Sequence, residues 1–126
     1  MKNIFFSVFI CASLSFFSQK IVFDSPKYNF GHLQKGQIDT MVFKFKNAGN
    51  APLIITETKV ECSCTKVDYP SDPIAPGSDG EIKIVFDSKG AIGYQDRVVT
   101  IISNSKKGDA KIHFKGEVLA KKKMGF

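Results

Sequence analysis

The sequence predicts an all-β fold, a β-sandwich of about seven antiparallel strands. Apolar and polar residues alternate with a period of two in a series of short segments, which is the pattern of half-buried strands. Turn-forming residues separate these segments, and no stretch keeps the apolar period of an α-helix over several turns. Strands that recur at this spacing are typical of a sandwich, in which two sheets press their apolar faces together.

The first 18 residues predict a secretory signal peptide. A short basic start, 1–3, precedes an almost unbroken apolar run over 4–17. This run is shorter than the roughly 20 residues of a membrane-spanning helix, so a retained anchor is the weaker interpretation. Small residues place the cut after Ser15 or after Ser18, and we expect the second. Removing 18 of the 126 residues, Lys2 among them, leaves 108 residues with 17 basic and 12 acidic side chains, a net charge of +5.

Seven strands are expected in the mature chain, within one domain over 19–119. By residue number they cover 21–23, 28–30, 39–47, 53–60, 80–87, 96–103 and 110–119. In 39–47 the alternation puts Met41, Phe43 and Phe45 on one face, although Val42 blurs the division. The other inward positions are Ile82, Ile84, Phe86, Val99, Ile101, Ile112, Phe114 and Val118. Burial of each inward phenylalanine should stabilise the fold by about 2–3 kcal/mol.

Two turns rich in glycine and proline separate these strands. The first covers 47–52 and includes Gly49 and Pro52, and the second contains Pro76 and Gly77. The prolines fix the backbone at the corners. We expect both glycines to adopt backbone conformations that a β-carbon disfavours. These four residues are the candidate structural turn residues.

Composition and motifs indicate neither catalysis nor nucleic-acid binding. The sequence has no Gly-x-Ser-x-Gly, phosphate loop, dinucleotide fingerprint or His-Glu-x-x-His motif. His32 falls in an expected turn and His113 on an outward strand face, so neither is spaced to activate a cysteine. The positive charge is spread along the chain, with one run, 121–123, in a basic tail over 120–126. We therefore expect no catalytic residues, metal ligands or cofactors, and no nucleic-acid partner.

Cys62 and Cys64 are the candidate thiol pair. Loss of Cys11 with the signal peptide leaves two cysteines in an oxidising compartment, so one intramolecular disulfide is predicted. Residues two apart in a regular strand lie too far apart at Cα for this bond, so the backbone must turn at Ser63. Two alternatives stay open, a two-coordinate copper(I) site and two thiols that merely fill a strand end.

Several of these segments resemble one bacterial family in their residues and in their order. They are Phe30-Gly31, 43–55, Cys62-Ser63-Cys64-Thr65, Ile74-Ala75-Pro76-Gly77, Phe86-Asp87 and Ser103-Asn104. The chain resembles domain-of-unknown-function family 1573, an immunoglobulin-like module of exported proteins that is distantly similar to Hydin-like and major sperm protein-like domains. Ser63 departs from the glycine that the family commonly has there. The resemblance implies an immunoglobulin-like sandwich and export, and it implies no reaction.

Together these observations predict an exported, non-catalytic recognition or structural module of the bacterial envelope, periplasmic or extracellular. Loops on a rigid sandwich or an open edge strand would bind envelope proteins, glycans or a second copy of the chain. The mature chain is expected to contain no transmembrane segment. The alternative is a small thiol redox or copper(I)-handling protein that uses Cys62 and Cys64.

Overall fold

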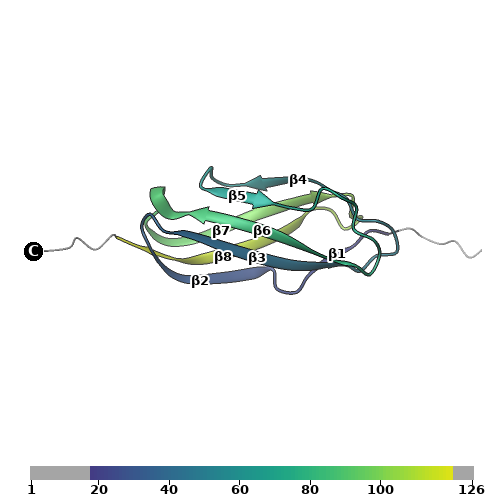
Figure 1. The fold of residues 1–126 in the computed structure, drawn as a ribbon, viewed down its shortest axis with the longest axis horizontal. Coiled ribbons are helices and arrows are strands. Elements are labelled where there is room, and N and C mark those ends of the chain that lie inside the picture. The colour runs from purple at the N-terminus through teal and green to yellow at the C-terminus, as the bar shows by residue number, and fades with distance from the viewer. Residues whose placement is uncertain (1–17, 121–126) are drawn as a thin grey trace, which may run out of the picture.

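The computed structural model describes residues 18–120, which form two packed β-sheets (Figure 1). The expected signal peptide, except for Ser18, and the lysine run of the expected tail lie outside the described residues. Within the described range, no helix is long and apolar enough to cross a membrane.

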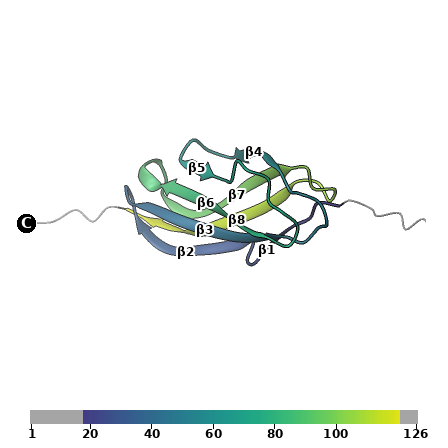
Figure 2. The same cartoon turned by 45° about the vertical axis from the view of Figure 1, so that its right-hand side comes forward.

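Eight strands form the two sheets, four in each. Sheet A has the order β1-β3-β6-β5, and sheet B has the order β2-β8-β7-β4 (Figures 1 and 2). The strands are β1 (Ile21–Phe23), β2 (Lys27–Gln34), β3 (Ile38–Asn47), β4 (Ile55–Val60), β5 (Thr65–Asp68), β6 (Asp79–Asp87), β7 (Gly93–Ser103) and β8 (Ala110–Leu119), with a short 3-10 helix, η1 (Ser88–Gly90), after β6. The predicted all-β sandwich is thus confirmed.

Three details of the strands differ from the expectation. First, β2 pairs with β8 in parallel, whereas all strands were expected to be antiparallel. The chain leaves β1, which pairs with β3 at the edge of sheet A, passes Pro26, which cannot donate a backbone hydrogen bond, and joins sheet B as β2 in the direction of β8. Second, β2 runs on to Gln34, so His32 lies in a strand and not in a turn. Third, β5 was not predicted, because it has four residues and little alternation.

The expected apolar faces form the core. Met41, Phe43 and Phe45 alternate with exposed residues along β3, and Val42 lies on the outer face, 46% exposed. The other inward positions predicted from the sequence are also buried: Ile82, Ile84, Phe86, Val99, Ile101, Ile112, Phe114 and Val118. The Phe86 and Phe114 rings lie 5.2 Å apart between the two sheets, measured at their centroids.

An irregularity in β2 lets one more aromatic ring reach this core. The register between β2 and β8 shifts between Asn29 and Gly31, and Gly31 has a φ of 72°. The Gly31 N–H donates to Asn29 Oδ1 at 2.8 Å. Phe30 then packs over Gly116, where a β-carbon would overlap its ring. The Phe30 ring centroid lies 5.6 Å from that of Phe86.

The two turn glycines are needed for different reasons. Gly77 has a φ of 78°, as expected for a residue that a β-carbon disfavours. The same prediction for Gly49 was wrong, because its φ is not positive. Instead the backbone of Ser18 to Lys20 passes directly over Gly49. A β-carbon there would overlap the Ser18 carbonyl oxygen and lie 2.8 Å from the Lys20 nitrogen.

Asn47 joins the two turns through a fully buried side chain. Its amide nitrogen donates to the carbonyl oxygens of Ala51 at 2.8 Å and Ile74 at 2.9 Å. Its Oδ1 accepts from the Gly49 N–H at 3.0 Å. Its backbone carbonyl accepts from the Gly77 N–H at 2.8 Å. Sequence reasoning placed Asn47 in the turn but missed that it holds both turns together.

Candidate functional site

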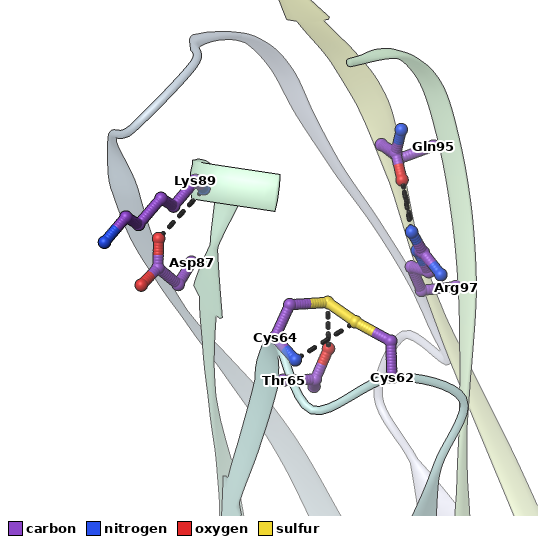
Figure 3. The surroundings of a disulfide bond; sticks show 7 residues. All are labelled: Cys62, Cys64, Thr65, Asp87, Lys89, Gln95 and Arg97. Carbon is purple, nitrogen blue, oxygen red and sulfur yellow. Dashed lines mark hydrogen bonds between the residues drawn. A yellow bond between two sulfur atoms is a disulfide. The ribbon is translucent and has the colours of Figure 1, made fainter. Parts of the chain in front are cut away.

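The two candidate cysteines lie where the chain crosses from one sheet to the other. β4 ends in sheet B at Val60 and β5 begins in sheet A at Thr65, so residues 61–64 form the crossover (Figure 3). Two contacts hold the crossover in place. The Val98 N–H of β7 donates to Glu61 Oε1 at 3.0 Å, and the Asp87 N–H of β6 donates to the Cys64 carbonyl at 2.9 Å.

Cys62 and Cys64 are joined through their sulfurs in the structure, and the backbone turns between them at Ser63. Their Cα atoms lie 5.3 Å apart, which is within the usual disulfide range. The Cys64 N–H donates to Cys62 Sγ at 3.1 Å, and Cys64 Sγ lies 3.7 Å from the Thr65 hydroxyl (Figure 3). Both cysteines are half-buried. That the pair is oxidised after the expected export stays a prediction.

A shallow hollow of about 620 Å³ opens beside this crossover. It is lined by Ile38, Ser63, Cys64, Lys66, Val85, Asp87, Lys89 and Gly90, and we call this set the hollow. Ile38 and Val85 give it an apolar surface, and the two lysines and Asp87 give it charge. Asp87 is held in place because its Oδ1 accepts from the Lys89 N–H at 3.0 Å (Figure 3). Only Cys64 of the two cysteines lines the hollow.

Ser88 fixes the neighbouring turn between β2 and β3. Its buried hydroxyl donates to the Gln37 carbonyl at 2.6 Å and accepts from the Gly36 N–H at 3.0 Å. Ile38 follows this turn directly. Sequence reasoning missed Ser88 because its partners lie about 50 positions away in the sequence.

The three most exposed large hydrophobic side chains all lie at the same end of the sandwich, with Ile38 on sheet A and Tyr94 on sheet B. Ile38 and Ile92 are 62% exposed and Tyr94 is 68% exposed, more than any other large hydrophobic residue in 18–120. Ile38 opens β3, Ile92 lies between η1 and β7, and Tyr94 is the second residue of β7. We call this end the disulfide end; it comprises 35–38, the crossover 61–64, 88–94 and the last residues of β8.

An arginine shares the inward side of β7 with core residues at this end. Gln95 is only 8% exposed, and the alternation along β7 puts Arg97 on the same side (Figure 3). Arg97 donates from Nη2 and Nε to Gln95 Oε1, at 2.7 and 3.1 Å. The charged guanidinium is thus bonded to a neutral amide, and neither of the two ion pairs found between residues 18 and 120 includes it.

The two histidines lie away from the cysteines. His32 Nε2 lies 3.5 Å from Glu117 Oε2, and His113 Nδ1 lies 3.7 Å from Asp96 Oδ1, each at an exposed or half-exposed position of sheet B. Across the described part of the chain, no three His, Cys, Asp or Glu side chains are grouped so that they could hold a metal ion.

The four predicted turn residues lie at the opposite end from the cysteines. Gly49 and Pro52 follow β3, while Pro76 and Gly77 precede β6. We call this end the turn end; it also holds the 104–109 turn. Here the pKa of Lys107 is lowered, because a hydrogen bond with the Lys20 side chain and the like charge of Lys20 favour its neutral form. The sequence candidates therefore form two separate groups, one structural and one beside the hollow.

The family model "Protein of unknown function (DUF1573)" matches residues 21–118, which is nearly the whole described sandwich. The chain belongs to this family. The resemblance inferred from its motifs is therefore confirmed. No curated protein sequence matches this DUF1573 domain.

Solved structures support the fold of the DUF1573 domain. A protein of unknown function from Porphyromonas gingivalis W83 superposes with a TM-score of 0.71 at 18% identity, over 79% of this chain and 47% of that chain. The ASH / PapD-like domain 7 of human CEP192 gives 0.65 at 11% identity, over 83% and 89% of the two chains. A major sperm protein family member from C. elegans, WR4, gives 0.50 at 10% identity, over 82% and 99%. The domain thus spans about half of the Porphyromonas chain, and at these identities the likeness concerns the fold alone.

Proposed function

We propose that this DUF1573 chain is an exported, non-catalytic recognition module whose binding surface is the disulfide end. One observation carries the proposal: Ile38, Ile92 and Tyr94 are the most exposed large hydrophobic residues of the described domain, and all three belong to this end. Loops and strand ends of a rigid sandwich are the usual place for binding residues, and large exposed apolar side chains at such positions favour contact with a partner. The crossover and the buried Ser88 hold the loops of this end, so the surface is rigid before a partner arrives.

The edge strands of the two sheets favour binding through the disulfide end over binding by addition of a partner strand. The edge strands are β1, β5, β2 and β4. β1 and β5 have three and four residues, and the registers of β2 and β4 are interrupted, between Asn29 and Gly31 and between Ile55 and Glu57. Short and bulged edges are how sandwiches discourage pairing with another strand. Loop-mediated binding of an envelope protein or glycan, or of a second copy, is therefore the better supported route.

Paired triple variants test the surface. The first carries Ile38→Thr, Ile92→Thr and Tyr94→Thr. The control carries Val22→Thr, Val42→Thr and Ile54→Thr, at three other exposed hydrophobic positions. Each immobilised chain is used to capture molecules from an envelope fraction, and sedimentation measures self-association. The first variant should lose either the molecules that the wild type captures or the self-association of the wild type. The control variant should keep both. Equal behaviour of the two variants would contradict the proposal.

The thiol alternative is separated by a chain that lacks both cysteines. Cys62→Ser with Cys64→Ser should retain the captured partners if recognition is the function, and should lose them if binding proceeds through sulfur. A copper(I) site would require both thiolates, which are joined to each other in the structure. Copper(I) binding therefore requires reduction of the pair first.

A further inference from the structure

We propose that the Cys62–Cys64 pair is a site of thiol–disulfide exchange for anionic thiols, in which the incoming sulfur attacks Cys64 and Cys62 leaves. The thiol is a small molecule with a net negative charge or a cysteine of a partner protein beside acidic groups. This activity goes beyond the proposed recognition function and does not rest on it, because a small thiol needs no contact with Ile92 or Tyr94.

Access distinguishes the two sulfurs. Cys64 lines the hollow, together with Ser63, whereas Cys62 does not. Cys62 lies on the sheet B side of the crossover, next to Glu61, whose side chain is bonded to β7. A thiol that enters the hollow therefore meets Cys64 first. Which sulfur is attacked depends on such access as well as on intrinsic reactivity.

Charge in the hollow favours an anionic thiol. Two ammonium groups, Lys66 and Lys89, and one carboxylate, Asp87, belong to its lining. The Asp87 carboxylate already accepts a hydrogen bond from the backbone N–H of Lys89. This bond partly offsets the negative charge that Asp87 presents to the hollow. The net charge of the lining is +1, which attracts a negatively charged thiol and repels a positively charged one.

The leaving sulfur is stabilised by the backbone. The Cys64 N–H donates to Cys62 Sγ at 3.1 Å. A hydrogen bond to the charged form of a group favours that form, so negative charge is better accommodated on Cys62 when the bond breaks. Cys64 Sγ has a longer contact, 3.7 Å from the Thr65 hydroxyl, in which either group can be the donor. Because a thiol of lower pKa leaves faster, the two cysteines are suited to opposite roles.

The exchange balances with two thiols. The first thiolate forms a bond to Cys64 Sγ, and the electron pair of the Cys62–Cys64 bond leaves on Cys62. A second thiolate attacks the sulfur of the bound thiol and releases Cys64 as a thiolate. The protein disulfide gains two electrons and the two small thiols become one disulfide. With a partner cysteine, the first step alone gives a mixed disulfide between the two proteins.

The experiment follows the first step on the oxidised, exported chain. The probes are glutathione, which is anionic, and cysteamine, which is cationic, at low and high salt. The reaction is stopped with acid and free thiols are alkylated. Trypsin releases 60–66, which contains both cysteines between Lys59 and Lys66, and fragmentation of this peptide locates each group. We expect the glutathione adduct on Cys64 and the alkyl group on Cys62.

The rate comparison tests the charge of the hollow. Per thiolate, glutathione should react about threefold or more faster than cysteamine at low salt, and the difference should shrink at high salt because ions screen it. Lys66→Gln with Lys89→Gln should remove the difference. The control, Lys44→Gln with Lys46→Gln, removes the same charge from exposed positions on β3 of the same sheet and should keep it. Thermal melts establish that all variants are folded.

Single-cysteine variants test the leaving group. Cys64→Ser keeps the backbone N–H that donates to Cys62, so its remaining thiol should have a lower pKa than the thiol of Cys62→Ser, as measured by thiolate absorbance. Adducts mainly on Cys62, equal rates for the two probes, or the reverse order of the two thiol pKa values would overturn the proposal. Recovery of two free thiols that oxidised glutathione does not close would also overturn it.

Discussion

At the scale of single residues, Gly49 and Gly77 show that glycine can be required in two physically different ways. Gly77 needs its left-handed φ of 78°, and no atom lies within 4 Å of where its β-carbon would be. The φ of Gly49 is not positive, but a β-carbon has no room there, because the backbone of Gln19 and Lys20, which the expected cleavage after Ser18 leaves in place, covers it. The sequence predicts a turn at both places. The backbone that packs over Gly49, however, comes from a segment about 30 residues earlier, so the turn sequence alone does not reveal it.

We expect these two glycines to respond differently to the same substitutions. Gly77→Val should destabilise the domain by about 1–3 kcal/mol, whereas Gly77→Asn should cost little, because asparagine tolerates this conformation. At Gly49 even alanine should cost about 1–3 kcal/mol, because the new atom must displace packed backbone. Thermal melts of the four variants Gly77→Val, Gly77→Asn, Gly49→Ala and Gly49→Asn check this. A Gly49→Ala melt equal to that of the wild type would mean that the 18–20 segment does not dock on the turn.

At the scale of elements, the strands with long and regular alternation could be predicted and the irregular ones could not. The 39–47, 80–87 and 110–119 segments are strands within one residue of the expected bounds, because each buries one continuous face. β2 was only partly predicted because its bulge at Gly31 interrupts the alternation. The turn at Ser63 followed from the cysteine spacing. The hollow could not be predicted, because its lining comes from β3, the crossover, β5, β6 and η1. How these segments align with one another cannot be inferred from the pattern within any one of them.

Asn47 provides a test of how the two turns hold together. Asn47→Asp keeps the shape and the acceptor for the Gly49 N–H but removes the donors to Ala51 and Ile74. It should lower the free energy of unfolding by about 2–4 kcal/mol, because two buried carbonyls lose their partner and face a carboxylate. The matched control is Asn29→Asp, since Asn29 acts as an acceptor for the Gly31 N–H and aspartate keeps that role. Equal midpoints in denaturant for the two variants would show that the Asn47 donors do not stabilise the fold.

At the scale of the whole molecule, the family and the sandwich are established, and the destination of the chain is a prediction. The family model covers 21–118, so it begins after the expected signal peptide. Charged and polar side chains dominate the outward positions of β3 and β8. A domain of this size can bury enough apolar surface to fold without a disulfide, so we expect Cys62 and Cys64 to be available for another role.

We expect export to remove the first residues of the chain. Intact-mass measurement of protein from the envelope fraction should show a loss of roughly 2 kDa from the 13.9 kDa chain, as expected for a signal of ordinary length. A charged substitution in the apolar run, Phe9→Asp, should keep the full mass and leave the protein in the cytoplasm. Full-length protein in the cytoplasm from the unmodified gene would contradict the prediction.

The described chain enters and leaves the domain at opposite ends. This geometry determines which end of the sandwich a fusion partner or linker would cover. Ser18 lies at the turn end, where its carbonyl accepts from the Asn50 N–H, and Leu119 lies at the disulfide end, where its carbonyl accepts from the Lys35 N–H (Figures 1 and 2). A fusion partner, affinity tag or surface linker joined after residue 120 therefore emerges at the disulfide end. The same addition inserted in the 105–109 turn leaves the loops of that end uncovered, so it is the arrangement in which an immobilised chain can present its disulfide end.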